Sequence, residues 1–187
     1  MNKIVGVLAL QGAYQKHSEI LARLKMDSRA IRKESELNAC SALIIPGGES
    51  STISLLIQEY GLYEAIKAFA ENHPVMGVCA GMIMMATEVD DERVKPLGLI
   101  PFKALRNHYG RQLHSFTADI KLNFDSSTFH AHFIRAPGIT ELPQETKVLA
   151  TYNGEAVMIK KDKHVALSFH PELTNDTRIH QYYLNLF

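Results

Sequence analysis

Cys79 lies at the end of a short apolar run and is flanked, two residues away on each side, by Gly77 and Gly81. This spacing is typical of a nucleophile elbow, in which a strand ends, one residue occupies a tight turn and a helix begins. The glycines are expected to leave room for the turn and for a ligand to approach the backbone. A thiol at a helix N-terminus is stabilised as the thiolate. The pattern predicts a nucleophilic cysteine.

The sequence His-Pro-Glu, at positions 170–172, also follows an apolar run. His170 can accept the proton of a nearby thiol, and Glu172 can orient the imidazole and stabilise its charged form. A thiol, an imidazole and a carboxylate at strand ends are the groups that covalent acyl transfer requires. We therefore predict a triad of Cys79, His170 and Glu172. Glu172 could also serve as an N-terminal charge for the segment that starts near Thr174.

Both cysteines have a simpler interpretation, because a free cysteine is usually a small buried residue. The flanking glycines and the downstream His-Pro-Glu favour a nucleophile at Cys79, whereas Cys40 has no such neighbours and is assigned to the core. Two cysteines make no disulfide framework. This favours a reducing compartment, and we expect a cytoplasmic protein.

Two glycine turns are predicted to share a cleft with the nucleophile. Gln11-Gly12 and Gly47-Gly48 each follow an apolar strand, and ligands of a doubly wound sheet bind beyond the carboxyl ends of its strands. The backbone amides of Gly47, Gly48 and Ala80 could stabilise the oxyanion of a tetrahedral intermediate. Phosphate binding is the alternative use of such a turn. The Gly-Lys-Ser/Thr ending of a P-loop is absent, which weakens that alternative.

Five further side chains could bind a charged group. Arg106, Arg111 and Arg135 could bind a substrate carboxylate, although a surface salt bridge is the default role for any one of them. His130 and His132 lie two apart on a predicted strand, so they share a face and could hold a metal ion. Zinc catalysis needs three protein ligands, and no third ligand accompanies this pair. A solvated strand face is therefore favoured, and we expect no metal or other cofactor.

Alternating strands and helices must position these groups. Apolar runs and helical spacing predict strands at residues 3–9, 28–32, 42–45 and 74–78, and helices at residues 14–24, 51–59 and 63–71. Ser51 or Thr52 is expected to begin the second of these helices, and Gly61 to end it. This alternation argues for a parallel sheet with helices on both faces.

The second half of the chain has the pattern of antiparallel strands. Apolar and polar residues alternate at residues 116–122 and 129–133, and turn sequences mark hairpins at residues 153–154 and 161–163. A last helix from about Asp176 should carry Ile179, Tyr182, Tyr183 and Leu186 inward. We predict a single domain over residues 1–187 with an α/β fold, in which a doubly wound, mostly parallel sheet is flanked by helices and extended by antiparallel strands.

Composition excludes several other classes of protein. The 187 residues include 20 basic and 20 acidic side chains without a like-charge block, which disfavours binding to nucleic acid or to an anionic membrane. No apolar stretch is long enough to span a bilayer. The apolar N-terminal run is broken at Gln11-Gly12, so it resembles a first core strand more than a signal peptide.

Taken together, the motifs resemble those of class I glutamine amidotransferases, and within them those of the glutaminase subunits of pyridoxal 5'-phosphate synthases. Cys-Ala-Gly with His-Pro-Glu points to the superfamily. Leu-Gln-Gly, Pro-Gly-Gly-Glu-Ser and Phe-Ile-Arg-Ala-Pro together select the subfamily. The matching segments are residues 7–13, 46–52, 78–81, 106–107, 110–112, 133–137 and 169–173.

The resemblance implies that L-glutamine is the substrate. Cys79 would attack the side-chain amide, His170 would pass the proton to the departing ammonia and then activate water, and Glu172 would orient His170. The positions that match the family's glutamine-binding residues are Gly47, Gly48, Glu49, Arg106, Ile134 and Arg135. The ammonia would pass to a separate barrel-shaped synthase subunit, within a large hetero-oligomer, for the synthesis of pyridoxal 5'-phosphate.

Some positions depart from the family pattern. Val78 stands where threonine is common, His108-Tyr109 replaces the usual Ala-Phe, and methionines replace leucine-rich residues at 82–85. Val78 removes a hydroxyl beside the nucleophile but leaves the triad intact. Two alternatives stay open: the same chemistry could serve another acceptor, as in the imidazole glycerol phosphate pathway, or the fold could be a non-catalytic glutamine-binding module. Loss of the cysteine, histidine or glutamate would indicate such a module, and all three are present.

Overall fold

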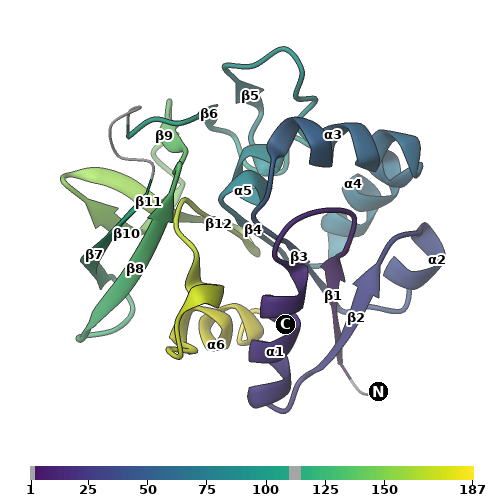
Figure 1. The fold of residues 1–187 in the computed structure, drawn as a ribbon, viewed down its shortest axis with the longest axis horizontal. Helices are drawn as coiled ribbons and strands as arrows, with labels where there is room; N and C mark the ends of the chain where they lie inside the picture. Colours follow the sequence, from purple (N-terminus) through teal and green to yellow (C-terminus); the bar gives the residue numbers. More distant parts are fainter. Residues whose placement is uncertain (1–2, 110–114) are drawn as a thin grey trace.

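Two β-sheets and their flanking helices make up residues 3–109 and 115–187, the part of the chain that the computed structural model describes (Figure 1). The larger sheet contains β1 (Ile4–Leu8), β2 (Asp27–Ile31), β3 (Ala42–Ile45), β4 (Val75–Val78), β7 (Ser115–Leu122), β8 (Thr128–Ile134), β10 (Lys147–Tyr152), β11 (Glu155–Lys161) and β12 (His164–Leu167). The smaller sheet contains β5 (Glu88–Val89), β6 (Lys103–Leu105) and β9 (Gly138–Thr140). The helices are α1 (Tyr14–Arg23), α2 (Glu34–Leu37), α3 (Ser50–Glu59), α4 (Leu62–Asn72), α5 (Ala80–Met85), α6 (Arg178–Leu184) and the 3-10 helix η1 (Pro171–Leu173).

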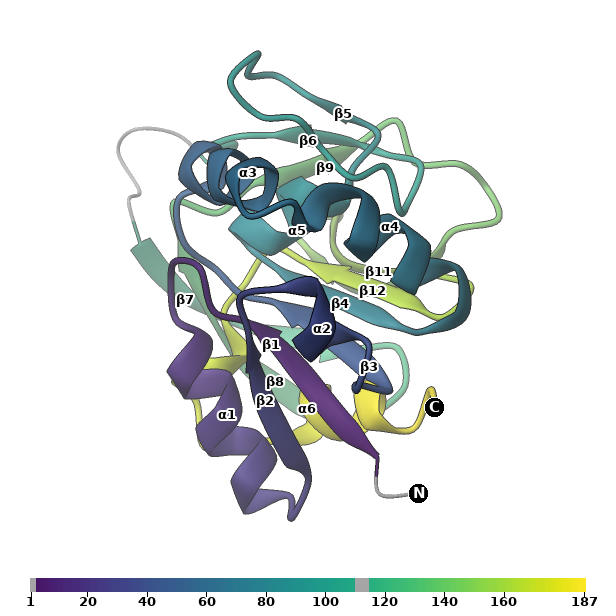
Figure 2. The same cartoon turned by 90° about the vertical axis from the view of Figure 1, so that its right-hand side faces the viewer.

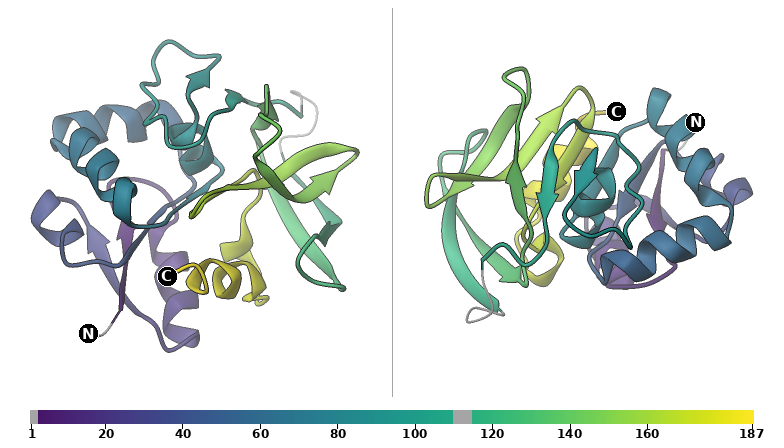
Figure 3. Two further views of the ribbon diagram at one scale, coloured as in Figure 1. Left: turned by 180° about the vertical axis from the view of Figure 1, so that it is seen from behind. Right: turned by 90° about the horizontal axis from the view of Figure 1, so that it is seen from above.

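The larger sheet has the strand order β2-β1-β3-β4-β12-β11-β10-β7-β8. Its first five strands are parallel neighbours, and the remaining pairings are antiparallel. Helices α3, α4 and α5 cover one face of the parallel part, and α1 and α6 cover the other (Figures 1 and 2). The antiparallel strands continue the sheet beyond its parallel part (Figure 3). This arrangement confirms the predicted doubly wound α/β fold with added antiparallel strands.

The central parallel strands are buried on both faces. In β3, Leu43 and Ile45 pack into the core beneath α3 and α4, whereas Ala42 and Ile44 pack into the core that contains residues of α1 and α6. All four side chains are fully buried. Because neither face of such a strand meets water, its sequence is a continuous apolar run rather than an alternation.

The start of α3 differs from the prediction. The expected first residues were Ser51 or Thr52, but the N-cap is Glu49, whose side chain accepts a hydrogen bond from the Thr52 backbone amide at 2.7 Å. The Ser51 hydroxyl donates to the same carboxylate instead of capping the helix itself. A carboxylate at this position satisfies a free amide and also complements the positive end of the helix dipole.

Short elements and the chain's last helix also differ in part from the prediction. The smaller sheet and α2 were not predicted, because strands of two or three residues and a four-residue helix are too short to produce a periodic pattern. Helix α6 begins at Arg178 and buries Ile179 and Tyr183, whereas Tyr182 and Leu186 are half-buried. None of the described helices is both long and apolar enough to cross a membrane.

Candidate active site

Cys79 occupies a strained turn between β4 and α5. Its backbone has φ 50° and ψ −105°, which is unusual for a residue with a side chain and persists where the surrounding structure enforces it. The Cys79 amide donates to the carbonyl of Leu167 on β12 at 2.8 Å, and the residue is 7% exposed. The local geometry is therefore that of the predicted elbow.

The two glycines beside the elbow are required by packing within the protein. A Cβ atom on Gly77 would lie 2.5 Å from the carbonyl oxygen of Gly81 and 2.5 Å from Sδ of Met85. A Cβ atom on Gly81 would lie 2.0 Å from the carbonyl oxygen of Ile45. Helix α5 thus lies directly against β3 and β4, and the expectation that these glycines make room for a ligand is wrong.

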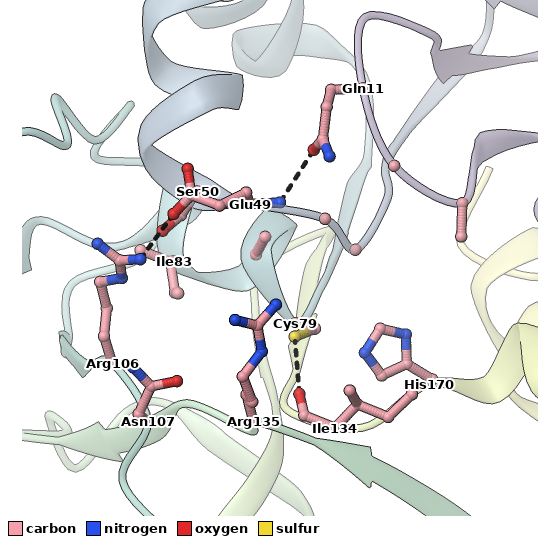
Figure 4. Close-up of a pocket in the computed structure, with 15 residues that line it drawn as sticks. Gln11, Glu49, Ser50, Cys79, Ile83, Arg106, Asn107, Ile134, Arg135 and His170 are labelled. Atoms are coloured by element: carbon pink, nitrogen blue, oxygen red, sulfur yellow. Dashed lines mark hydrogen bonds and ion pairs between the residues drawn. The ribbon is translucent and has the colours of Figure 1, made fainter. Parts of the chain in front are cut away.

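His170 and Glu172 follow β12, the strand next to β4. Nδ1 of His170 lies 2.6 Å from Oε1 of Glu172, and the two side chains are 10% and 0% exposed. Because Nδ1 is committed to Glu172, Nε2 is the nitrogen that remains for the thiol, and the ring lies beside Cys79 (Figure 4). The structure therefore brings the three residues of the predicted triad together. The alternative for Glu172, a charge at the N-terminus of a following helix, is not needed to explain its position.

The electrostatics of the site favour a proton on His170. Burial disfavours a charged ring, but interactions with Cys79 and with the Glu172 carboxylate outweigh it and raise the pKa of His170 to about 10. Burial likewise opposes ionisation of Glu172, but the hydrogen bond from His170 and the nearby imidazoles lower its pKa. At neutral pH the pair is therefore an imidazolium and a carboxylate.

The three predicted turns line one cavity of about 320 Å³ (Figure 4). The Ala13 amide donates to the carbonyl of Gly47 at 3.1 Å, and the Glu49 amide donates to Oε1 of Gln11 at 2.9 Å. These bonds join the turn after β1 to the turn after β3. Cys79, Ala80 and His170 also line this cavity. The expectation of a shared cleft at the carboxyl ends of the parallel strands is confirmed.

The predicted arginines differ in their surroundings. Nη2 of Arg106 lies 2.7 Å from Oε1 of Glu49, and its Nη1 pairs with Asp91, so its charge is already balanced. Burial raises the pKa of Glu49, but hydrogen bonds from the first residues of α3 outweigh this effect and lower it to about 2. The Arg135 side chain extends into the cavity toward Cys79 (Figure 4). Arg111 lies outside the described residues.

Strand β8 contributes the remaining wall. The carbonyl of Ile134 faces Sγ of Cys79 at 3.8 Å, and the His132 carbonyl accepts the His170 amide at 2.8 Å. His130 points away from this site: it is exposed and pairs with Asp119 at 2.8 Å, as expected for a solvated strand face. Within residues 3–109 and 115–187, no three histidine, cysteine or acidic side chains are placed to hold a metal ion.

Sequence reasoning missed several residues of the site. Asn107 lines the cavity, and its backbone has φ 52°. Behind Glu172 lie His17 and His180, both fully buried. Their positions on the apolar faces of α1 and α6, three residues before Ile20 and Tyr183 respectively, were visible from helical spacing. Nothing local indicated that the two rings meet.

A thiol, an imidazole and a carboxylate at the carboxyl edge of parallel strands form a site of the acyl-transfer type. The chain belongs to the SNO glutamine amidotransferase family, whose profile matches residues 7–187. It is 42% identical over 183 residues to pyridoxal 5'-phosphate synthase subunit PdxT of Thermosipho africanus, with 97% of each chain covered. It is 44% identical over 188 residues to the protein of the same name from Thermoplasma acidophilum, with 97% of this chain and 92% of that one covered.

The fold comparison agrees with the sequence comparison. A crystal structure of a glutamine amidotransferase superposes with a TM-score of 0.92 at 41% identity, and 97% of each chain is covered. Family membership confirms the resemblance drawn from the motifs and the prediction that the chain is a glutamine amidotransferase. It also disfavours the non-catalytic alternative.

Proposed function

We propose that this chain is a single-domain glutaminase that hydrolyses L-glutamine to L-glutamate and ammonia through a thioester on Cys79, and supplies the ammonia to a pyridoxal 5'-phosphate synthase subunit. The observation that carries the proposal is the hydrogen-bonded pair of His170 and Glu172, which lies beside the strained, buried Cys79. A cavity of about 320 Å³ opens beside it, which is a size suited to a small substrate.

In the first half-reaction, the sulfur of Cys79 attacks the side-chain carbonyl carbon of glutamine. The tetrahedral oxyanion is stabilised by backbone amides, for which Gly47, Gly48 and Ala80 are the candidates at this edge of the cavity. His170 donates its proton to the amide nitrogen, the carbon–nitrogen bond breaks, and ammonia leaves. A raised pKa at His170 supports this step, because it keeps the needed proton on the ring.

In the second half-reaction, water replaces ammonia. His170, now neutral, removes a proton from water as the oxygen attacks the thioester carbon. Collapse of the second tetrahedral intermediate releases glutamate, and the sulfur of Cys79 and the protonated ring are restored. Glu172 keeps Nδ1 of His170 protonated and directs Nε2 at the reacting atoms throughout.

The amino-acid end of glutamine binds on the side of the cavity that contains the arginines. We assign the substrate carboxylate to Arg135, because within the described residues no acidic side chain pairs with it, whereas Arg106 already bridges Glu49 and Asp91. Arg106 and Glu49 then shape the cavity wall, and the Ile134 backbone carbonyl borders the reacting end. A planar guanidinium can bind a carboxylate through two hydrogen bonds.

The acceptor of the ammonia is a barrel-shaped synthase subunit in a large hetero-oligomer. The relatives in Thermosipho africanus and Thermoplasma acidophilum are each named as a pyridoxal 5'-phosphate synthase subunit, which supports a synthase partner. We place the reaction in the reducing cytoplasm, because Cys79 must stay reduced to act and both cysteines of the chain are free thiols.

Glutamate release from glutamine tests this proposal, measured for the chain alone and with the synthase subunit of the same organism. We expect weak activity alone, stimulation by the partner, and none for Cys79→Ala. Cys40→Ala is the matched control, because Cys40 is buried away from the cavity, and it should keep its activity. Unchanged turnover in Cys79→Ala refutes the mechanism, and failure of the synthase to stimulate refutes the assigned partner.

A further inference from the structure

Two buried histidines from distant parts of the chain stand behind the proposed triad. Nδ1 of His17, on α1, lies 3.0 Å from Nε2 of His180, on α6. Nε2 of His17 lies 3.7 Å from Oε2 of Glu172, the carboxylate oxygen that is not bonded to His170. Both atoms of this contact are buried, and neither has a partner within hydrogen-bond distance among the described residues.

The partners select one tautomer of His17. One of the two nitrogens between the rings must carry a proton, and the other must accept it. If Nδ1 of His17 carried the proton, its Nε2 would present a lone pair to the carboxylate of Glu172, which is repulsive. If Nε2 carries the proton, the ring accepts from His180 and directs an N–H group at Glu172. His17 is therefore the Nε2-protonated form.

We propose that His17 is a positioning residue whose Nε2–H group holds the distal oxygen of Glu172, so that the proximal oxygen stays directed at His170 during turnover. The 3.7 Å separation is longer than a hydrogen bond. Contacts of this kind in a site without substrate are often long and tighten when the substrate binds. The inference rests on the proposed function, because it assumes that Glu172 orients a catalytic His170.

A neutral donor suits this role better than a charged one. Burial lowers the pKa of His17, more strongly than the charge of Glu172 raises it. Burial, His17 and Arg23 likewise lower the pKa of His180. A positive charge at His17 would compete with the imidazolium of His170 for the carboxylate. The neutral ring orients Glu172 and leaves its charge available to His170.

Other charged and titratable groups also lie around Glu172 or act on its neighbours. On the elements around η1 these groups include Lys16, Glu19 and Arg23 of α1, His180 of α6, and His132 of β8. The first three line an open cleft, to whose wall Glu172 and Leu173 of η1 also belong. His132 holds the backbone of His170 through its carbonyl. His17 is thus the described donor that faces the distal oxygen.

Two substitutions of similar polarity separate the two contacts of His17. In His17→Asn the side-chain amide reaches the Nδ1 position, so the contact with His180 is kept and the donor toward Glu172 is lost. In His17→Gln the amide nitrogen reaches the Nε2 position, so that donor is kept. The assay is glutamate release in the complex with the synthase subunit, with kcat and KM measured across pH.

We expect kcat of His17→Asn to fall about tenfold with KM unchanged. In the profile of kcat against pH, the acidic limb should move to higher pH by about one unit. The limb moves upward because the Glu172 anion loses a donor, which raises its pKa. His17→Gln should recover most of both properties. The control for loss of a buried imidazole is His164→Asn. In the wild type, the His164 ring lies at the other end of β12 and accepts a hydrogen bond from the Val75 amide at 3.2 Å. His164→Asn should lower thermal stability and leave the pH profile in place.

The outcomes distinguish this inference from the function it rests on. If Cys79→Ala is inactive while His17→Asn has the kcat and acidic limb of the wild type, only the role of His17 is overturned. The same holds if His17→Asn and His17→Gln lose activity equally without a shift of the limb, which is the result for a merely structural histidine. If Cys79→Ala stays active, the proposed function fails first.

Discussion

A methyl group at Gly47 tests the catalytic geometry without replacing a catalytic side chain. A Cβ atom built on Gly47 lies 2.5 Å from Cε1 and 3.1 Å from Nδ1 of His170. Gly47 is not among the glycines with positive φ, so alanine fits the backbone itself. The steric clash of Gly47→Ala is therefore with the imidazole ring.

The size of the effect follows from the room available to the ring. An ordinary contact begins at 3.4 Å, so the ring or the turn must move by about 0.9 Å to accept a Cβ atom at 2.5 Å. His170 resists this movement, because Nδ1 is held by Glu172 at 2.6 Å and its amide by His132 at 2.8 Å. A misplacement of about 1 Å can reduce the rate about 100-fold. We expect that loss in kcat for Gly47→Ala.

The measurement is steady-state glutamate release in the presence of the synthase subunit, together with thermal unfolding. Gly98→Ala is the matched control, because its Cβ atom would meet nothing within 4 Å. Its positive φ of 69° should cost about 1 kcal/mol of stability and leave kcat unchanged. A kcat for Gly47→Ala within about threefold of the wild type would refute the inferred contact with His170.

Two further substitutions test the wall of the cavity. Glu49→Gln should lower the free energy of unfolding by about 1 kcal/mol at pH 7, a value reduced for partial exposure of this side chain. Because folding lowers the pKa of Glu49 from 4.5 to about 2, the stability that its carboxylate contributes is present above pH 4.5 and is lost as the pH falls toward 2. Urea unfolding of both proteins across this range should show the difference in unfolding free energy narrowing toward low pH. A difference that stays constant would contradict the capping role of the Glu49 carboxylate. Arg135→Ala should raise KM for glutamine about 10- to 100-fold with little change in kcat, and Arg135→Lys should restore part of the loss. Steady-state kinetics decide this, and an unchanged KM in the alanine variant would show that the substrate carboxylate binds elsewhere.

Much of the fold could be predicted from the sequence wherever a strand is buried along its whole length, because such a strand is a continuous apolar run. Strand β3 was predicted at its observed bounds, because all four residues of Ala42–Ile45 are buried and none is polar. Cys79 and His170 were identified because each follows such a strand, and parallel neighbours place their carboxyl ends at one edge. The small sheet escaped prediction because each of its strands is stabilised by pairing with distant residues rather than by its own pattern.

The sequence by itself determined the chemical groups and the edge of the sheet at which they meet. Only the tertiary structure decided how they are held. Glu49 caps α3 because Ser51 and Thr52 turn toward its carboxylate, a choice that composition leaves open. His17 and His180 are 163 residues apart and meet because α1 and α6 cover the same face of the sheet. The local helix and strand propensities of the sequence cannot predict such contacts, because the contacts depend on how two helices pack against a third element.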